Sequence, residues 1–123
     1  MSAPPWYSGK LTDPISLSPG KTVPVAEITV DREGYALVAG NLKMKLRSTK
    51  PVKLDIWLLR VKADDPTCYS SPTFPGGEDD FYWWPVWMGA IDKGETYRWY
   101  VRTETGLSGT LTTRYCKGHP LRL

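Results

Sequence analysis

The sequence has little of what catalysis, membrane insertion or nucleic-acid binding requires. Its one histidine, His119, lies near the C-terminus, where a Ser-His-Asp or Cys-His site would lack a rigid setting. No apolar run approaches the roughly 18 residues that span a membrane. The net charge of +3 is too small to indicate nucleic acid, because such binding rests on many phosphate contacts. We therefore expect a protein that is not an enzyme and has neither a nucleic-acid nor a membrane partner.

Motifs for metals and cofactors are also missing. No Gly-rich loop joins a strand to a helix, and no calcium loop of the DxDxDG type is present. The carboxylates cluster at Asp64-Asp65 and at Glu78-Asp79-Asp80, and the second cluster adjoins a run of aromatic residues. Carboxylates flanked by tryptophan could line a glycosidase cleft, but a chain this short seldom builds one. We expect no catalytic residues, no cofactor and no metal.

Only two cysteines are present, Cys68 and Cys116. They could form one disulfide that closes a long loop, or they could remain two buried or half-buried thiols. Their spacing matches no zinc or redox motif. The opening MSAPPWYSGK has no basic segment followed by an apolar one, so no signal peptide is expected. The protein would then be made in a cytoplasm, or be secreted if a signal peptide has been removed.

The length of 123 residues and the eleven prolines and eleven glycines predict one domain with many turns. Residues 1–20 are rich in Pro, Ser and Gly, and they predict an extended N-terminal arm with at most one short edge strand. Residues 21–123 are expected to form a single β-sandwich domain. Within it, 66–80 is predicted to be a long irregular loop and 117–123 a tail.

Apolar and polar residues alternate most clearly at 42–46, 52–61, 96–102 and 110–115, which predicts β-strands. A phase shift near Ala26 predicts a β-bulge in the strand at 22–30, and no window keeps a helical period. Six to eight short strands joined by tight turns give an all-β fold, an antiparallel β-sandwich or jelly roll. The expected core residues are Leu42, Met44, Leu54, Ile56, Leu58, Trp99 and Val101.

The strand at 52–61 is apolar on both faces. Leu54, Ile56 and Leu58 alternate with Trp57, Leu59 and Val61. Such a strand needs cover on both sides, either from a second layer or from a partner.

The run FYWWPVW at 81–87 is the strongest functional signal. Pro85 should make it an edge strand or break it. Because alternate residues point to opposite faces, Phe81, Trp83 and Trp87 can enter the core, whereas Tyr82 and Trp84 cannot both do so. Large exposed apolar patches mark interaction sites; alternatively, the N-terminal arm covers this patch. The predicted binding surface comprises Trp6, Tyr7, Tyr82, Trp83, Trp84 and Trp87.

Charges of each sign cluster separately along the sequence. Basic residues from Lys43 to Lys53 lie on one predicted hairpin, and the carboxylates from Asp64 to Asp80 lie on loops expected at another edge. Opposite patches would suit head-to-tail contact between identical subunits. Ordinary solvated faces are the alternative.

Two stretches, TVPVAEITVDREGYALVAGNLKMKL and IDKGETYRWYVRTETG, resemble the strand-turn-strand pattern of small β-sandwich modules of tailed-phage particles. These include capsid decoration proteins and jelly-roll modules of tail and fibre proteins, some of them similar to the tumour-necrosis-factor and C1q fold. The resemblance covers residues 20–115, and a fibronectin type III domain fits GETYRWYVRTETG equally well. No family residues are carried over.

The resemblance implies a virion accessory protein, most directly a capsid decoration protein of a tailed phage that is made in the host cytoplasm. It would associate with itself and dock on capsid or tail subunits through its aromatic residues and N-terminal arm. The alternative is a carbohydrate- or receptor-binding β-sandwich. The placement of Tyr82 and Trp84 distinguishes the two, because burial against a neighbouring chain favours the structural role, whereas coplanar, solvent-exposed rings favour sugar.

Overall fold

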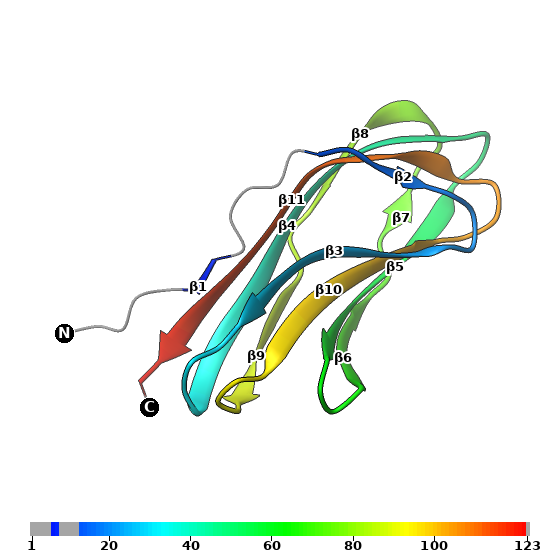
Figure 1. Ribbon diagram of the computed structural model, residues 1–123. Helices are drawn as coiled ribbons and strands as arrows, with labels where there is room; N and C mark the ends of the chain where they lie inside the picture. The colour runs from blue at the N-terminus through cyan, green and yellow to red at the C-terminus, as the bar shows by residue number, and fades with distance from the viewer. Residues whose placement is uncertain (1–5, 8–12, 123) are drawn as a thin grey trace.

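The computed structural model describes residues 6–7 and 13–122, and within them the chain forms eleven β-strands and no helix. The strands form two antiparallel sheets that pack face to face (Figure 1). The all-β antiparallel sandwich predicted from the alternation is confirmed. More strands are present than the six to eight expected, because the arm and the predicted loop also contain strands.

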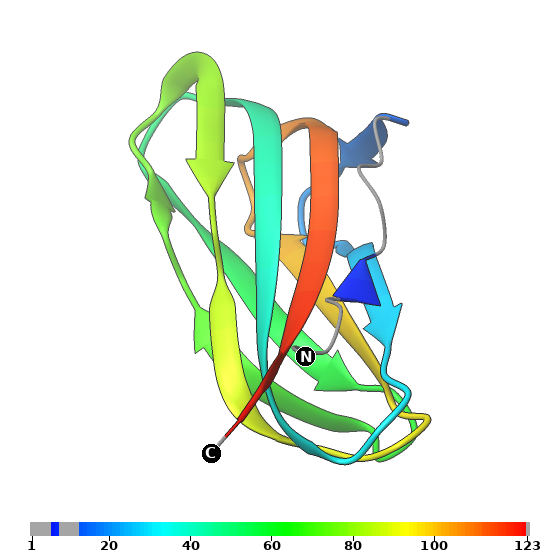
Figure 2. The ribbon, with the colours of Figure 1, turned by 90° about the vertical axis from the view of Figure 1, so that its left-hand side faces the viewer.

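The six-stranded sheet has the order β1-β11-β4-β8, with β2 also paired to β11 and β9 also paired to β4. Its strands are β1 (Trp6–Tyr7), β2 (Ile15–Leu17), β4 (Gly34–Ser48), β8 (Gly77–Trp83), β9 (Val86–Ile91) and β11 (Ser108–Leu121). The long pair β4 and β11 forms its centre, and β8 and β9 run one after the other along the free side of β4 (Figure 2).

The five-stranded sheet has the order β3-β10-β5-β6, with β7 beside β5. Its strands are β3 (Thr22–Thr29), β5 (Val52–Arg60), β6 (Asp65–Ser70), β7 (Thr73–Phe74) and β10 (Thr96–Thr103). The register of β3 against β10 shifts between Trp99 and Tyr100, which face Ala26 and Pro24. The β-bulge predicted near Ala26 is confirmed.

The hydrophobic core lies between the two sheets. All seven residues predicted for it are 0% exposed. Alternation along β4 and β5 explains this result, because every second side chain of each strand points into the same layer. The break at Pro85 is confirmed as well: β8 ends at Trp83, β9 begins at Val86, and the Pro85 carbonyl accepts a hydrogen bond from the Gly40 amide at 2.8 Å.

Three predictions about irregular segments are wrong. The stretch 66–80 is not a long loop, because it holds most of β6, all of β7 and the start of β8. The residues after 116 are not a tail, because β11 continues to Leu121 beside β4. The N-terminal arm supplies two strands rather than at most one, and both pair with β11. Proline and glycine are frequent in these segments, but they do not exclude strands: Pro66 lies in β6 and Pro120 in β11, whereas Pro72 and Pro75 lie between strands.

Candidate interaction surface

The outer face of the six-stranded sheet carries most of the exposed apolar surface. Six large hydrophobic side chains are exposed among the described residues, and five of them lie on β4, on β8 and β9, or between these two strands. We call these five residues the aromatic face: Tyr35, Tyr82, Trp84, Val86 and Met88. Trp84 and Met88 are 60% and 62% exposed.

Tyr82 and Trp84 form the centre of the aromatic face. Their rings lie 6.1 Å apart with only 12° between their planes. Lys43 faces Tyr82 from β4, and its ammonium lies 5.6 Å from the centre of the tyrosine ring. With Thr113 and Tyr115 these residues line a shallow groove of about 370 Å³. The two rings are therefore nearly parallel and open to solvent.

The apolar surface continues along β9. Val86, Met88 and Ala90 face Ala39, Leu37 and Tyr35 of β4 in the antiparallel register. Because these residues alternate with inward-pointing ones, they form a band on one side of the sheet. The aromatic face therefore includes Tyr35, Val86 and Met88, which the predicted binding surface did not contain.

Charged residues occupy the other end of the same face. Lys45 faces Asp80 and Arg47 faces Glu78 across the β4–β8 pair. The prediction that these basic and acidic residues form separate patches is wrong, because the strand pairing that the sequence did not reveal brings them side by side. They give the aromatic face a mixed-charge border.

Two predicted surface residues support the aromatic face from below. Trp83 packs against Phe81, with ring centres 6.2 Å apart, and its indole nitrogen donates to the Ser70 hydroxyl at 3.1 Å. Trp87 packs against buried Tyr97, with ring centres 5.5 Å apart. Both tryptophans are half-buried against the core, as the alternation of 81–87 predicted for Trp83.

Trp6 lies on the opposite edge of the sheet, so its side chain does not cover the aromatic face of its own chain. β1 pairs with β11, with Trp6 beside Gly118, whereas β8 and β9 flank β4. The Trp6 indole donates to Asp31 at 3.1 Å, and Arg32 lies 5.2 Å above its ring. The hydrogen bond from Arg32 also lowers the pKa of the Asp31 carboxyl. The side chain of Tyr7 lies outside the described part of the structure.

Cys116 is a buried thiol in β11, and burial raises the pKa of this thiol to about 12. Cys68 belongs to β6 in the other sheet, and its side chain is not described. The predicted disulfide between Cys68 and Cys116 therefore stays a prediction, because the side chain of Cys68 lies outside the described part of the structure. The separation of two cysteines in sequence carries no information about which sheet each one joins.

His119 is not placed as the sequence predicted. It is half-buried within β11 opposite Leu37, rather than in a tail. Among residues 6–7 and 13–122, no group of three or more His, Cys, Asp or Glu side chains could hold a metal ion. No helix in this part of the chain is long and apolar enough to cross a membrane.

The outer face of the five-stranded sheet holds a second feature, which the predicted site residues did not include. Three rings form a row across β10, β5 and β6: Tyr100, Trp57 and Tyr69. A groove of about 720 Å³ runs over this row. The sequence did contain a signal for this row of rings. The strand at 52–61 is apolar on both faces, and Trp57 lies on the outer one because it alternates with the core residues Ile56 and Leu58.

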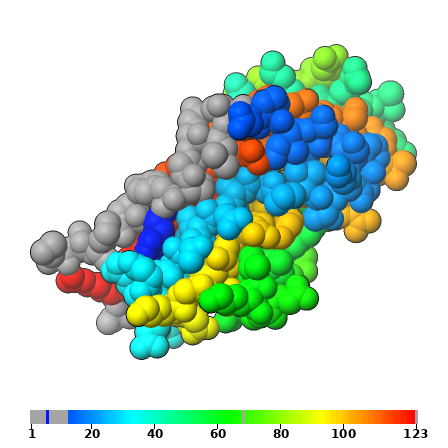
Figure 3. All heavy atoms as spheres, in the orientation of Figure 1, coloured from blue at the N-terminus to red at the C-terminus, as the bar shows by residue number. Residues whose placement is uncertain are grey.

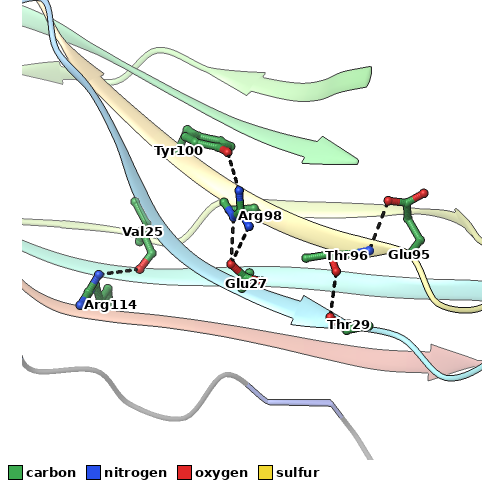
Figure 4. Close-up of polar contacts among 8 residues, drawn as sticks. All are labelled: Val25, Glu27, Thr29, Glu95, Thr96, Arg98, Tyr100 and Arg114. Carbon is green, nitrogen blue, oxygen red and sulfur yellow. Dashed lines mark hydrogen bonds and ion pairs between the residues drawn. The ribbon is translucent and has the colours of Figure 1, made fainter. Parts of the chain in front are cut away.

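The Tyr100 end of this row is fixed by a polar network. Arg98 donates to the Glu27 carboxylate at 2.9 Å and to the Tyr100 hydroxyl at 3.0 Å, as Figure 4 shows. The hydrogen bond to Tyr100, together with Glu27, raises the pKa of the Arg98 guanidinium. β3 and β10, which supply these three residues, lie side by side on the surface in Figure 3.

The chain matches no protein-family model and no curated protein sequence. Its fold is similar to several solved structures. Eiger TNF from S. frugiperda has a TM-score of 0.60 and 11% identity, with 99% of this chain and 94% of that one covered. The globular domain of the zebrafish complement 1qA protein has a TM-score of 0.59 and 10% identity, with 98% of each chain covered.

A third similar structure comes from a virus. The T13 particle of IBDV contains a chain that matches with a TM-score of 0.60 and 10% identity. The match covers 97% of this chain but 32% of the viral chain. At such identities the similarity establishes the fold alone. The protein is a β-sandwich of the jelly-roll type, with TNF and C1q domains among its structural neighbours.

Proposed function

We propose that the chain is a non-catalytic structural accessory protein of a virus particle, most directly a capsid decoration protein of a tailed phage. The aromatic face is the observation that supports this function. Five exposed apolar side chains on one sheet form a patch of the kind that marks interaction sites. The fold similarity to a chain of the IBDV particle is consistent with a virion protein.

Protein is the partner that best matches the aromatic face as a whole. Val86 and Met88 extend it beyond the two rings, and neither offers a flat surface to a sugar. Methionine adapts to irregular apolar surfaces. The charged rows Lys45–Asp80 and Arg47–Glu78 provide the polar rim that surrounds the apolar centre of protein interfaces.

In this proposal the protein docks as an oligomer on capsid or tail subunits. The aromatic face joins copies of the chain and contacts the particle, and the N-terminal arm supplies a further contact. It would be made in the host cytoplasm and function on the virion.

A carbohydrate- or receptor-binding role for the aromatic face is the second candidate. Tyr82 and Trp84 are exposed and only 12° from parallel, the arrangement expected of a pair that stacks on sugar rings. If this role applies, Trp84 carries the binding and Met88 contributes nothing.

Co-sedimentation with purified empty capsids of tailed phages tests the proposed function. The wild-type protein should sediment with at least one capsid at a fixed ratio to the capsid subunit. Met88→Ser should abolish this binding, because it places a hydroxyl in the apolar contact. Tyr69→Ser, an equally exposed change on the other sheet, is the matched control. Binding that survives Met88→Ser but is lost with Tyr69→Ser would contradict the proposal.

A further inference from the structure

The groove over the five-stranded sheet is a second candidate site, on the face opposite to the aromatic face. We call it the Trp57 groove and define it by Asp55, Trp57, Asp64, Tyr69, Tyr100 and Arg102. Its volume of about 720 Å³ lies within the range of about 300–1,000 Å³ that is usual for small-ligand sites.

The Trp57 groove is extended rather than round. A neighbouring hollow of about 550 Å³ shares Asp55 and Arg102 with it and continues to Lys50 and Glu104. Together the two hollows follow β5 and β10 along the sheet. Such a shape suits a chain-like ligand better than a compact one.

Aromatic rings make up the middle of the groove. Trp57 lies between Tyr100, at 5.6 Å and 15°, and Tyr69, at 6.3 Å and 27°. Tyr69 is 67% exposed, whereas Arg98 holds Tyr100 in place. Because neighbouring rings and the Arg98 network already restrict these side chains, a ligand loses little of its binding free energy to ordering them.

Polar groups stand on both sides of the rings. Asp55 and Arg102 are direct partners in the β5–β10 register, and Asp55 also accepts a hydrogen bond from the Ser71 hydroxyl at 3.1 Å. Asp64 lies at the far end, in the turn between β5 and β6, with a φ of 50°. Carboxylates and a guanidinium thus offer acceptors and donors next to the aromatic surface.

We propose that the Trp57 groove binds a neutral glycan chain. The C–H groups on the flat side of a sugar ring are weakly positive and pack against the negative face of an aromatic ring. Sugar hydroxyls can both donate to Asp55 or Asp64 and accept from Arg102. Few other polymers present an apolar face and many hydroxyls together.

Other polymers match the groove less well. Single-stranded nucleic acid also stacks on aromatic rings, but Asp55 and Asp64 would repel its phosphates. A protein partner would bury less apolar area here than on the aromatic face, because Tyr69 is the one large hydrophobic side chain exposed on this sheet within the described residues, against five on the aromatic face. Glu27 and Arg98 already form an ion pair with each other, so neither charge is free to attract a charged partner to this sheet.

This inference does not depend on the proposed function. The Trp57 groove and the aromatic face lie on opposite sheets, so a particle and a glycan could be bound at the same time. A protein held on a surface by its six-stranded sheet would present the groove outward.

A glycan array of neutral glucose-, mannose-, galactose- and N-acetylhexosamine-containing oligosaccharides supplies the probes. The best of them is then titrated by calorimetry into the full-length wild type, Trp57→Ala, Tyr69→Ala and Trp84→Ala. Tyr69→Ala is the main variant, because Tyr69 is mostly exposed and its removal leaves the core intact. Trp84→Ala is the matched control, since Trp84 is 60% exposed against 67% for Tyr69 and, like Tyr69, stacks on one other aromatic ring.

We expect the wild type to bind at least one neutral glycan, and both Trp57→Ala and Tyr69→Ala to weaken that binding at least tenfold. Trp84→Ala should stay within twofold of the wild type. The proposal is overturned if no neutral glycan binds at millimolar concentration, or if heparin or poly(U) binds better than every neutral glycan. It is also overturned if Trp84→Ala loses the glycan while Tyr69→Ala retains it, because the sugar site would then be on the aromatic face.

Discussion

Replacing Ile56 with alanine tests which side of strand β5 points into the hydrophobic core. Ile56 is 0% exposed, and it lies opposite Val101 of β10 in the layer between the sheets. Removing its three outer carbon atoms costs about 2.4 kcal/mol of transfer free energy, at about 0.8 kcal/mol for each. The cavity left behind increases the loss, and the usual total for this change is about 2–5 kcal/mol.

Urea unfolding followed by tryptophan fluorescence measures this loss directly. Thermal unfolding provides a second measurement. For a domain of this size a loss of 1 kcal/mol lowers the melting temperature by about 4 °C, so Ile56→Ala should lower it by about 8–20 °C. Leu59→Ala is the control, because Leu59 is half-buried on the outer face of the same strand and its truncation should cost only about 1 kcal/mol. An Ile56→Ala loss below about 0.5 kcal/mol, the level of a surface change, would refute the facing of β5.

Three further perturbations test other parts of the structure. Gly109→Ala should destabilise the fold by about 1–3 kcal/mol in urea unfolding, because the new methyl group would meet the backbone carbonyl of Lys45; an unchanged midpoint would contradict the β4–β11 register. For Cys116, the folded pKa of about 12 exceeds the unfolded value of 9.0, so its contribution to stability is complete below pH 9 and is lost towards pH 12. Unfolding free energies measured across this interval should therefore fall more steeply for the wild type than for Cys116→Ala, and equal slopes would be evidence against burial of the thiol. Deleting residues 1–8 removes the Trp6 contacts at the β11 edge, so the chain should melt at a lower temperature but remain folded and assemble more weakly; an unchanged oligomeric mass would show that the arm takes no part in assembly.

Local alternation was sufficient to predict the core and several strands. In β4 and β5 every second residue is buried, so Leu42, Ile56 and Leu58 could be assigned to the core without knowledge of their partners. The break at Pro85 and the bulge near Ala26 were also predictable, because each follows from a local rule: proline lacks an amide hydrogen, and a phase shift requires an extra residue.

Pairing between distant strands was not predictable in the same way. Trp6 lies against β11 rather than over Trp84 because hydrogen bonding to residues 117–118 places it there, more than 100 positions along the chain. Likewise, the row of Tyr100, Trp57 and Tyr69 exists only because β10, β5 and β6 are neighbours. A short, mostly polar strand such as β6, which contains Pro66, gives no local signal of its partner.

The proposed function depends most on the aromatic face being a protein–protein interface. Sedimentation velocity of the wild type, Met88→Ser and the control Tyr69→Ser measures this directly, because each replaced side chain is more than 60% exposed and neither change should affect folding. The account predicts that the wild type and Tyr69→Ser sediment as the same oligomer, whereas Met88→Ser sediments as a 13.9 kDa monomer. A wild-type protein that is monomeric at every concentration tested, or a Met88→Ser variant with the wild-type mass, would contradict it.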